Sequence, residues 1–153
     1  MTKIQAYERY SHEYFMNEAL KEAQKALERD EVPIGAIVVC QNRIIGRAHN
    51  LTEALTDVTA HAEMQAITAA SDNLGGKYLD ECSLYVTLEP CIMCAGAMFW
   101  AQLEKLIYGA EDKKRGYRLV RQQILHPKTE VITGILEQAC SSLIKAFFKN
   151  KRG

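Results

Sequence analysis

Hydrophobic residues recur along the chain with two periodicities, one typical of helices and one typical of strands. Apolar side chains spaced three or four residues apart predict helices at residues 11–29, 60–70, 91–101 and 137–149. Short runs rich in β-branched residues predict strands at residues 34–40, 44–48, 83–88, 105–108 and 130–133. Ser11 is placed to cap the first helix, and Gly75 and Gly76 to end the second.

The order of these elements is α, β, β, α, β, α, β, β, α. It predicts an α/β protein in three layers, with a mixed sheet of about five strands and helices on both faces. The parallel part of such a sheet places its site beyond the carboxyl ends of the strands. We read residues 1–153 as one domain, because no repeat or Pro-, Gly- or Ser-rich linker interrupts the pattern. The last helix is expected to place Ala139, Leu143, Ala146 and Phe147 on one face.

The composition is that of a globular protein. Hydrophobic residues make up 48% of the 153 residues and charged residues 25%, which is enough to form a packed core. The longest run without a polar side chain, residues 91–101, is about half the roughly 20 residues that a membrane span requires. We therefore expect no membrane span. The first 15 residues contain no apolar stretch typical of a secretion signal, and five cysteines is an odd number, so we expect a cytoplasmic protein.

Charge is distributed unevenly along the chain. Residues 1–112 contain nine Lys and Arg against 17 Asp and Glu, whereas residues 113–153 contain ten against two. A basic segment at the end of an acidic body indicates a localised surface for phosphates rather than a general affinity for polyanions.

Two cysteines, Cys91 and Cys94, stand three residues apart at the first turn of the third predicted helix. A helix N-terminus favours thiolates, because its unpaired N–H groups and dipole lower the thiol pKa. By itself this pair could be a redox couple, half of a zinc ribbon, or two small core residues. His61 lies thirty residues upstream, where another helix is predicted to begin. One His and two Cys make three zinc ligands, the number that leaves a catalytic position open.

Glu63 follows His61 by two residues. A zinc ion held by one neutral imidazole and two thiolates has its formal charge cancelled, so we expect it to acidify bound water weakly. A base must then stand nearby. Glu63 can accept the proton and return it to the leaving group, a role that contributes about 10²- to 10⁴-fold to the rate. Positions i and i+2 lie on different faces of a helix, so one can bind metal while the other meets substrate.

These residues form the pattern H-x-E followed by P-C-x-x-C, which resembles the signature of the zinc-dependent deaminases. The resemblance to the bacterial tRNA adenosine deaminases extends from Glu13 to Phe148. It is carried by VPIGAIVV, DVTAHAEMQAI, LYVTLEPCIMCAGAM and IYGAEDKKRG. After Gly116 the chain reads YRLVRQQILHPK, where members of that family usually have small residues and a longer loop.

The resemblance implies a cytidine-deaminase-like fold, one Zn²⁺ per subunit and a homodimer. It also implies that the wobble adenosine of a tRNA anticodon is converted to inosine, by attack of hydroxide on C6 of adenine and loss of ammonia. Asn50 would then contact the target base and Asp112 would lie near the neighbouring nucleotide. The backbone N–H groups of Ala62 and Cys91 are candidates to stabilise developing charge. Five cations that flank Tyr117 are candidate contacts to the RNA backbone: Lys113, Lys114, Arg115, Arg118 and Arg121.

Several alternatives remain open at this point. The chain could be a deaminase of the same fold that acts on a free base or nucleoside, such as guanine, cytosine or cytidine. It could also be a non-catalytic, zinc-stabilised nucleic-acid-binding module. A further alternative for His61, Cys91 and Cys94 is a closed structural zinc site with a fourth ligand, for which the candidates are Cys40, Cys82, Cys140, His12, His49 and His126. Glu89 is expected to be structural, and the basic run could be an ordinary solvated surface.

Overall fold

The computed structural model of the chain describes residues 6–152. Its elements in chain order are α1 (His12–Glu28), β1 (Gly35–Cys40), β2 (Arg43–His49), α2 (Ala62–Leu74), β3 (Cys82–Leu88), α3 (Ile92–Trp100), β4 (Lys105–Ala110), the 3₁₀ helix η1 (Tyr117–Leu119), β5 (Glu130–Thr133) and α4 (Glu137–Arg152). Within this part of the chain, no helix has both the length and the apolar character needed to cross a membrane.

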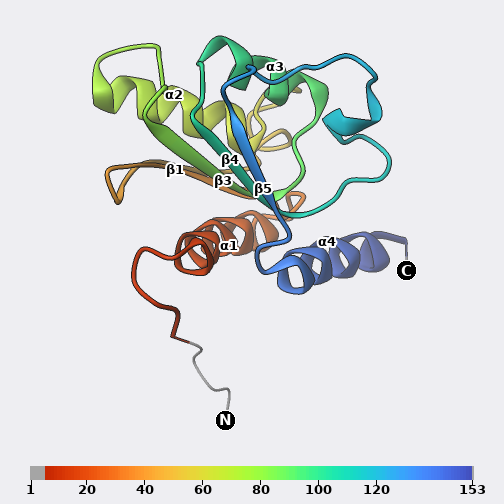
Figure 1. Cartoon of the computed structure of the whole chain (residues 1–153). Helices are drawn as coiled ribbons and strands as arrows, with labels where there is room; N and C mark the ends of the chain where they lie inside the picture. The colour runs from red at the N-terminus through yellow and green to blue at the C-terminus, as the bar shows by residue number, and fades with distance from the viewer. Residues whose placement is uncertain (1–5, 153) are drawn as a thin grey trace.

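The five strands form one mixed sheet in the order β2-β1-β3-β4-β5. Strand β1 pairs antiparallel with β2 and β3, whereas β4 pairs parallel with β3 and β5. Helices α2 and α3 cover one face of the sheet, and α1 and α4 cover the other (Figure 1). The predicted three-layer α/β/α architecture is therefore confirmed.

The hydrophobic core has two layers because successive residues of a strand point to opposite faces of the sheet. Val38 of β1 and Val86 of β3 are buried on the face covered by α2 and α3. Their neighbours Ile37 and Tyr85 are buried on the other face, where Phe15 of α1 packs against them. The regular alternation keeps the three central strands buried on both sides.

Two glycines allow helices to lie close to the sheet. A Cβ atom at Gly35 of β1 would collide with the backbone of α1 at Ala19, and one at Gly46 of β2 would lie 2.6 Å from the carbonyl oxygen of Ala66 in α2. Larger side chains at these positions would push the helices outward. The height of α2 above the sheet, and with it the position of the residues at its start, depends on this contact.

Some of the predicted boundaries and faces need correction. The second helix begins at Ala62 rather than at residue 60 and continues to Leu74. In α4 the buried residues are Cys140 and Phe147, whereas Ala139 and Ala146 are exposed, so the predicted apolar face was wrong in part. The reason lies on the sheet: Gly109 of β4 has no side chain, and Cys140 occupies that space.

A buried carboxylate, that of Glu22, fastens α1 to β2. It accepts hydrogen bonds from Lys25 Nζ at 2.7 Å and Arg47 Nε at 2.9 Å, and it lies 3.4 Å from His49 Nδ1. Burial disfavours the charge on Glu22, but these hydrogen bonds outweigh burial and lower its pKa below the usual value of 4.5. The folded state therefore prefers the ionised form.

We expect Glu22→Gln to lower the free energy of unfolding by about 1–3 kcal/mol near neutral pH, because charge-assisted hydrogen bonds are lost. A lowered folded-state pKa contributes stability that is complete above the unfolded value and is lost as pH falls through the folded value. The gap between wild type and variant should consequently shrink as pH falls below about 4.5, the usual value for Glu, and through the lower folded-state pKa. Urea unfolding at several pH values from neutral to acidic measures this difference in free energy. Glu28→Gln, at an exposed position, is the control. A gap that stays constant with pH would contradict this assignment.

Candidate active site

Two helix starts bring together the three residues predicted to bind metal. His61 is the N-cap of α2 and Cys91 is the N-cap of α3, and neither side chain caps its own helix. Both are therefore free to face each other. Cys94 lies in the first turn of α3 and is fully buried.

The distances between the donor atoms suit a tetrahedral metal ion. His61 Nδ1 lies 3.6 Å from Cys91 Sγ and 3.5 Å from Cys94 Sγ. A tetrahedral zinc ion with Zn–S near 2.3 Å and Zn–N near 2.0 Å would separate its sulfur and nitrogen ligands by about 3.5 Å. The three donor atoms all lie within 4.8 Å of one another, and the group is made of these three residues alone among residues 6–152. The site thus offers three ligands and leaves a fourth coordination position free.

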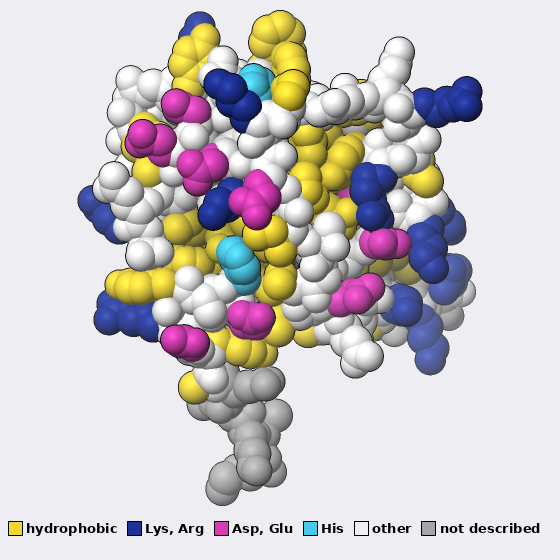
Figure 2. Space-filling model, viewed as in Figure 1, with side chains coloured by type: hydrophobic (Ala, Val, Ile, Leu, Met, Phe, Trp, Pro, Cys, Tyr) yellow, Lys and Arg dark blue, Asp and Glu magenta, His cyan; other side chains and the backbone are white. Residues whose placement is uncertain are grey.

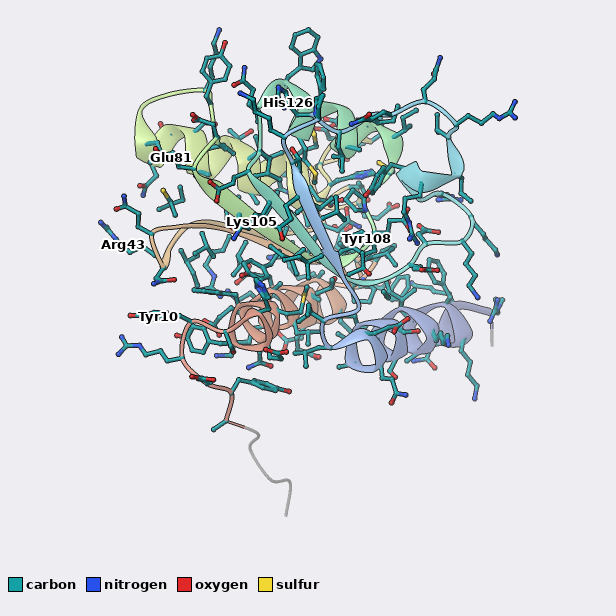
Figure 3. The ribbon with its side chains drawn as sticks, viewed as in Figure 1. Tyr10, Arg43, Glu81, Lys105, Tyr108 and His126 are labelled. Carbon is teal, nitrogen blue, oxygen red and sulfur yellow. The ribbon has the colours of Figure 1, made fainter. Side chains whose placement is uncertain are left out.

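The side chains considered as a fourth ligand have other surroundings. His12 Nδ1 lies 2.8 Å from the hydroxyl of Tyr85, and His49 faces Glu22. Cys40 and Cys82 are cross-strand neighbours on β1 and β3. Cys140 packs at Gly109. His126 lies against Phe99 of α3, with ring centres 5.7 Å apart, and is labelled in Figure 3.

The electrostatics of the two thiols indicate a place for a cation. Hydrogen bonding to the Cys94 thiol and to His61 lowers the pKa of Cys91 to about 3. The same negative sulfur, together with burial, raises the pKa of Cys94 above its usual range. The hydrogen-bond partners of Cys91 are therefore enough to stabilise one thiolate, whereas two adjacent thiolates require a bound cation.

Glu63, in the first turn of α2, lies beside this group and is only 4% exposed. Burial raises the pKa of Glu63 to about 7, against the opposing effects of its own backbone N–H and of His61. A carboxyl group in such surroundings can take up and release a proton near neutral pH, which is what a general acid/base needs.

Two backbone N–H groups at the helix starts are available to a ligand. Within the described chain no hydrogen bond is found for the N–H of Ala62 or of Cys91. Groups at the first positions of a helix have no partner inside the helix, and they carry the positive end of its dipole.

Asn50 follows β2 directly and is 5% exposed. Its N–H donates to the carbonyl oxygen of Ile34 at 3.1 Å, and its Oδ1 accepts from the N–H of Thr52 at 3.3 Å. These contacts fix its backbone and one end of its amide.

No pattern in the sequence pointed to Gln65, which joins the end of β2 to the start of α2. Its Nε2 donates to the carbonyl oxygens of His49 at 2.9 Å and Ala60 at 3.1 Å. Both partners are backbone atoms, which any residue type supplies, so only the structure could reveal this link.

Asp112 and Glu89 organise the segment that follows β4. Asp112 Oδ1 accepts from the N–H groups of Lys114 and Arg115 at 3.1 and 3.0 Å, which closes a turn. The buried carboxylate of Glu89 accepts from the N–H groups of Asp112 and Arg118, both at 3.1 Å. The expected structural role of Glu89 is confirmed.

The five candidate RNA contacts fall into two groups. Lys113, Lys114, Arg115 and Arg121 are exposed, and no salt bridge involves them within residues 6–152. Arg118 differs, because its Nη2 lies 2.9 Å from Glu111 and 3.3 Å from Glu89. Figure 2 shows Lys and Arg side chains gathered along the edge of the molecule where η1 and the end of α4 lie.

A three-layer fold with a His-Cys-Cys group beside a buried glutamate defines a deaminase of the cytidine-deaminase-like class. A profile of the MafB19-like deaminases matches residues 10–152, and the chain belongs to this family.

Individual relatives are similar over most of their length. The tRNA-specific adenosine deaminase of Bacillus subtilis is 46% identical over 145 residues, which is 92% of this chain and 90% of the relative. A solved structure from work on A-to-I editing by tRNA:A34 deaminases at the wobble position is 43% identical, with a TM-score of 0.79 over 85% of this chain and 98% of that one. Guanine deaminase from Bacillus subtilis is 39% identical, with a TM-score of 0.63 over 66% of this chain and 65% of that one.

We expect the purified protein to retain about one divalent metal ion per chain, because the three donors fit one tetrahedral ion. Cys94→Ser should lose most of this metal, since a hydroxyl is a much poorer ligand than a thiolate. Elemental analysis after dialysis measures the content. Cys140→Ser removes an equally buried thiol outside the group and should keep the metal, so equal loss in both variants would argue against the site.

Proposed function

We propose that this protein is a zinc-dependent deaminase that converts adenosine to inosine at the wobble position of a tRNA anticodon. The observation that carries the proposal is the buried Glu63 beside the three-ligand group of His61, Cys91 and Cys94. Similarity to tRNA-specific adenosine deaminases over nine tenths of the chain supports the choice of substrate.

A zinc ion on these three ligands would supply Lewis acidity, but because the two thiolates cancel its formal charge, a base is also needed to make water nucleophilic at neutral pH. Glu63 accepts a proton from the attacking water and delivers it to N1 of the adenine ring. It then takes the proton of the new hydroxyl group on C6 and transfers it to the amino group on C6, which leaves as ammonia while the C6 carbonyl of inosine forms. The reaction consumes one water molecule and one adenosine and yields inosine and ammonia. Burial of Glu63 supports this role, since it keeps bulk water from competing for the proton.

The walls of the site would hold the base. Asn50 is proposed to contact the target adenine through the part of its amide that Thr52 does not occupy. The N–H groups of Ala62 and Cys91 would stabilise charge that develops on the substrate. The bridge made by Gln65 supports this arrangement, because it holds the Asn50 strand end and the start of α2 in one relative position.

The RNA would lie against the exposed cations. A base in a folded anticodon loop must leave its stack to reach a buried site, and the backbone must be held while it does so. Lys113, Lys114, Arg115 and Arg121 are free for phosphate contacts. Asp112 lies at the start of this segment, where a neighbouring nucleotide would pass.

A homodimer in the cytoplasm is part of the proposal. Apolar side chains that are largely exposed in the single chain include Val58 at 84%, Trp100 at 77% and Ile92 at 51%. A second subunit that covers them would remove this surface from water. None of the five cysteines, which all lie within residues 6–152, is in a disulfide, as is usual in a reducing compartment.

Deamination of a free base is the second candidate, because guanine deaminase from Bacillus subtilis shares 39% identity over two thirds of the chain. Incubation with an adenosine-bearing anticodon stem-loop, guanine, cytosine and cytidine separates the two. We expect inosine in the RNA and no turnover of the free compounds. Turnover of a free compound alone would eliminate the RNA assignment.

We expect Glu63→Gln to lower kcat by about 10²- to 10⁴-fold, because the amide cannot carry the proton. Metal content and RNA affinity should be unchanged, which also separates an enzyme from a binding module. Product formation, elemental analysis and RNA binding are measured on the same sample, with the exposed Glu81→Gln as control. Residual activity near that of wild type would refute the role of Glu63.

Binding of the stem-loop should weaken steeply with salt. If the four exposed cations Lys113, Lys114, Arg115 and Arg121 neutralise phosphates of a single-stranded loop, log affinity falls against log salt with a slope of about −3. The triple change of Lys113, Lys114 and Arg115 to Gln should make the slope shallower by about 2, because three contacts are lost. The control Lys77→Gln removes an exposed cation that lies outside this segment, and it should leave the slope unaltered. An unchanged slope in the triple variant would place the RNA elsewhere.

A further inference from the structure

The carboxylate of Glu89 lies beneath the segment that carries the proposed RNA contacts. It is 4% exposed, and both of its oxygens accept backbone hydrogen bonds, one from Asp112 and one from Arg118. Gly116 passes directly over it, and a Cβ atom there would collide with the carboxylate. The backbone of residues 112–118 is therefore wrapped around one buried acid.

Arg118 contacts the Glu89 carboxylate from the solvent side. Its guanidinium lies 3.3 Å from Glu89 Oε1 and 2.9 Å from Glu111 Oε1, and its central carbon is 5.6 Å from the ring centre of Tyr108. Tyr108 is labelled in Figure 3 and lies on the side of β4 that faces this segment. Two carboxylates and one aromatic ring thus hold a single planar cation, a combination that suits Arg rather than Lys.

The same segment is fastened to the loop that precedes a metal ligand. Tyr117 donates its N–H to the carbonyl oxygen of Pro90 at 2.9 Å, and its ring lies edge-on to Tyr108. Glu89 and Pro90 come immediately before Cys91. A cavity of about 200 Å³ opens at this junction, with Glu89, Asp112, Lys113 and Arg118 among its lining residues.

We propose that Glu89 and Arg118 are positioning residues that hold residues 112–118 at a fixed place beside Cys91. Arg118 then pairs with carboxylates of the protein itself rather than with RNA. The exposed cations Lys113, Lys114 and Arg115 meet the RNA from the position that this pairing sets. The consequence for RNA rests on the proposed function, whereas the fastening of the segment does not.

The first experiment needs no RNA. Endoproteinase Lys-C cleaves after lysine and needs an extended stretch of chain, so we expect cleavage after Lys113 and Lys114 to become faster as the segment opens more often. We expect Glu89→Gln to raise this rate about tenfold, because its amide NH₂ would face a backbone N–H that has lost its acceptor. Arg118→Gln should act similarly. The double variant should be no faster than the faster single variant, since both residues fasten one segment.

The matched control is Lys128→Gln, which removes an exposed cation from the same half of the chain and should leave cleavage at the two lysines unchanged. Mass spectrometry identifies the cleavage sites, and thermal unfolding verifies that each variant is folded. Wild-type cleavage rates in folded Glu89→Gln and Arg118→Gln would overturn the proposal.

The second experiment measures deamination of the stem-loop. We expect Glu89→Gln and Arg118→Gln to raise KM about tenfold while kcat stays within about threefold and metal content is retained. Arg118→Lys should resemble Arg118→Gln, because one ammonium cannot replace the planar contact to two carboxylates. If Arg118 instead contacted a phosphate, Lys would restore KM, and that result would overturn the assignment.

The two experiments fail in different ways. A loss of kcat with unchanged KM would show that Glu89 acts on the metal ligands rather than on the segment, and would also refute the proposal. If the wild-type protein did not act on RNA at all, the proposed function would be at fault. The proteolysis experiment would then still test whether Glu89 and Arg118 hold residues 112–118 in place.

Discussion

The site depends on one constraint, the meeting of two helix N-termini at the same edge of the sheet. His61 precedes α2 and Cys91 precedes α3, and their donor atoms stand 3.6 Å apart although thirty residues separate them. The position of α2 is set by its close contact with β2 at Gly46. The position of α3 is set by β3, which lies in the middle of the sheet. The three ligands therefore come together only while both helices keep these positions on the sheet.

Two buried glutamates near this edge show how surroundings decide what a side chain does. Glu63 lies among sulfur atoms and an imidazole, and burial raises its pKa to about 7, so its proton can move. Glu89 meets two backbone N–H groups and a guanidinium, so its charge is used to hold the chain. The residue type is the same and the burial is the same. The partners differ, and this difference is the basis for proposing a proton-transfer role for Glu63 and a structural one for Glu89.

Buried carboxylates hold the loops on both sides of the site. Glu31 is 1% exposed and accepts hydrogen bonds from the N–H groups of Glu53 and Ala54 at 3.0 and 2.7 Å, which fixes the loop after Asn50. Glu89 does the same for the loop after β4. A carboxylate has no N–H of its own and can accept several, which suits it to a loop whose N–H groups lack partners. The site is therefore bordered by loops with defined shapes.

The sequence was enough to predict the order of helices and strands and the group of His61, Glu63, Cys91 and Cys94, because periodicity and motif spacing are local properties of the chain. It did not determine which face of α4 is buried, since that follows from the gap at Gly109 on a distant strand. Nor did it show that Gln65 bridges two backbone segments or that Arg118 pairs with Glu89 and Glu111. In the sequence Arg118 is one of five cations in a run. Only the tertiary structure gives it different partners from its neighbours, because those partners come from other elements of the fold.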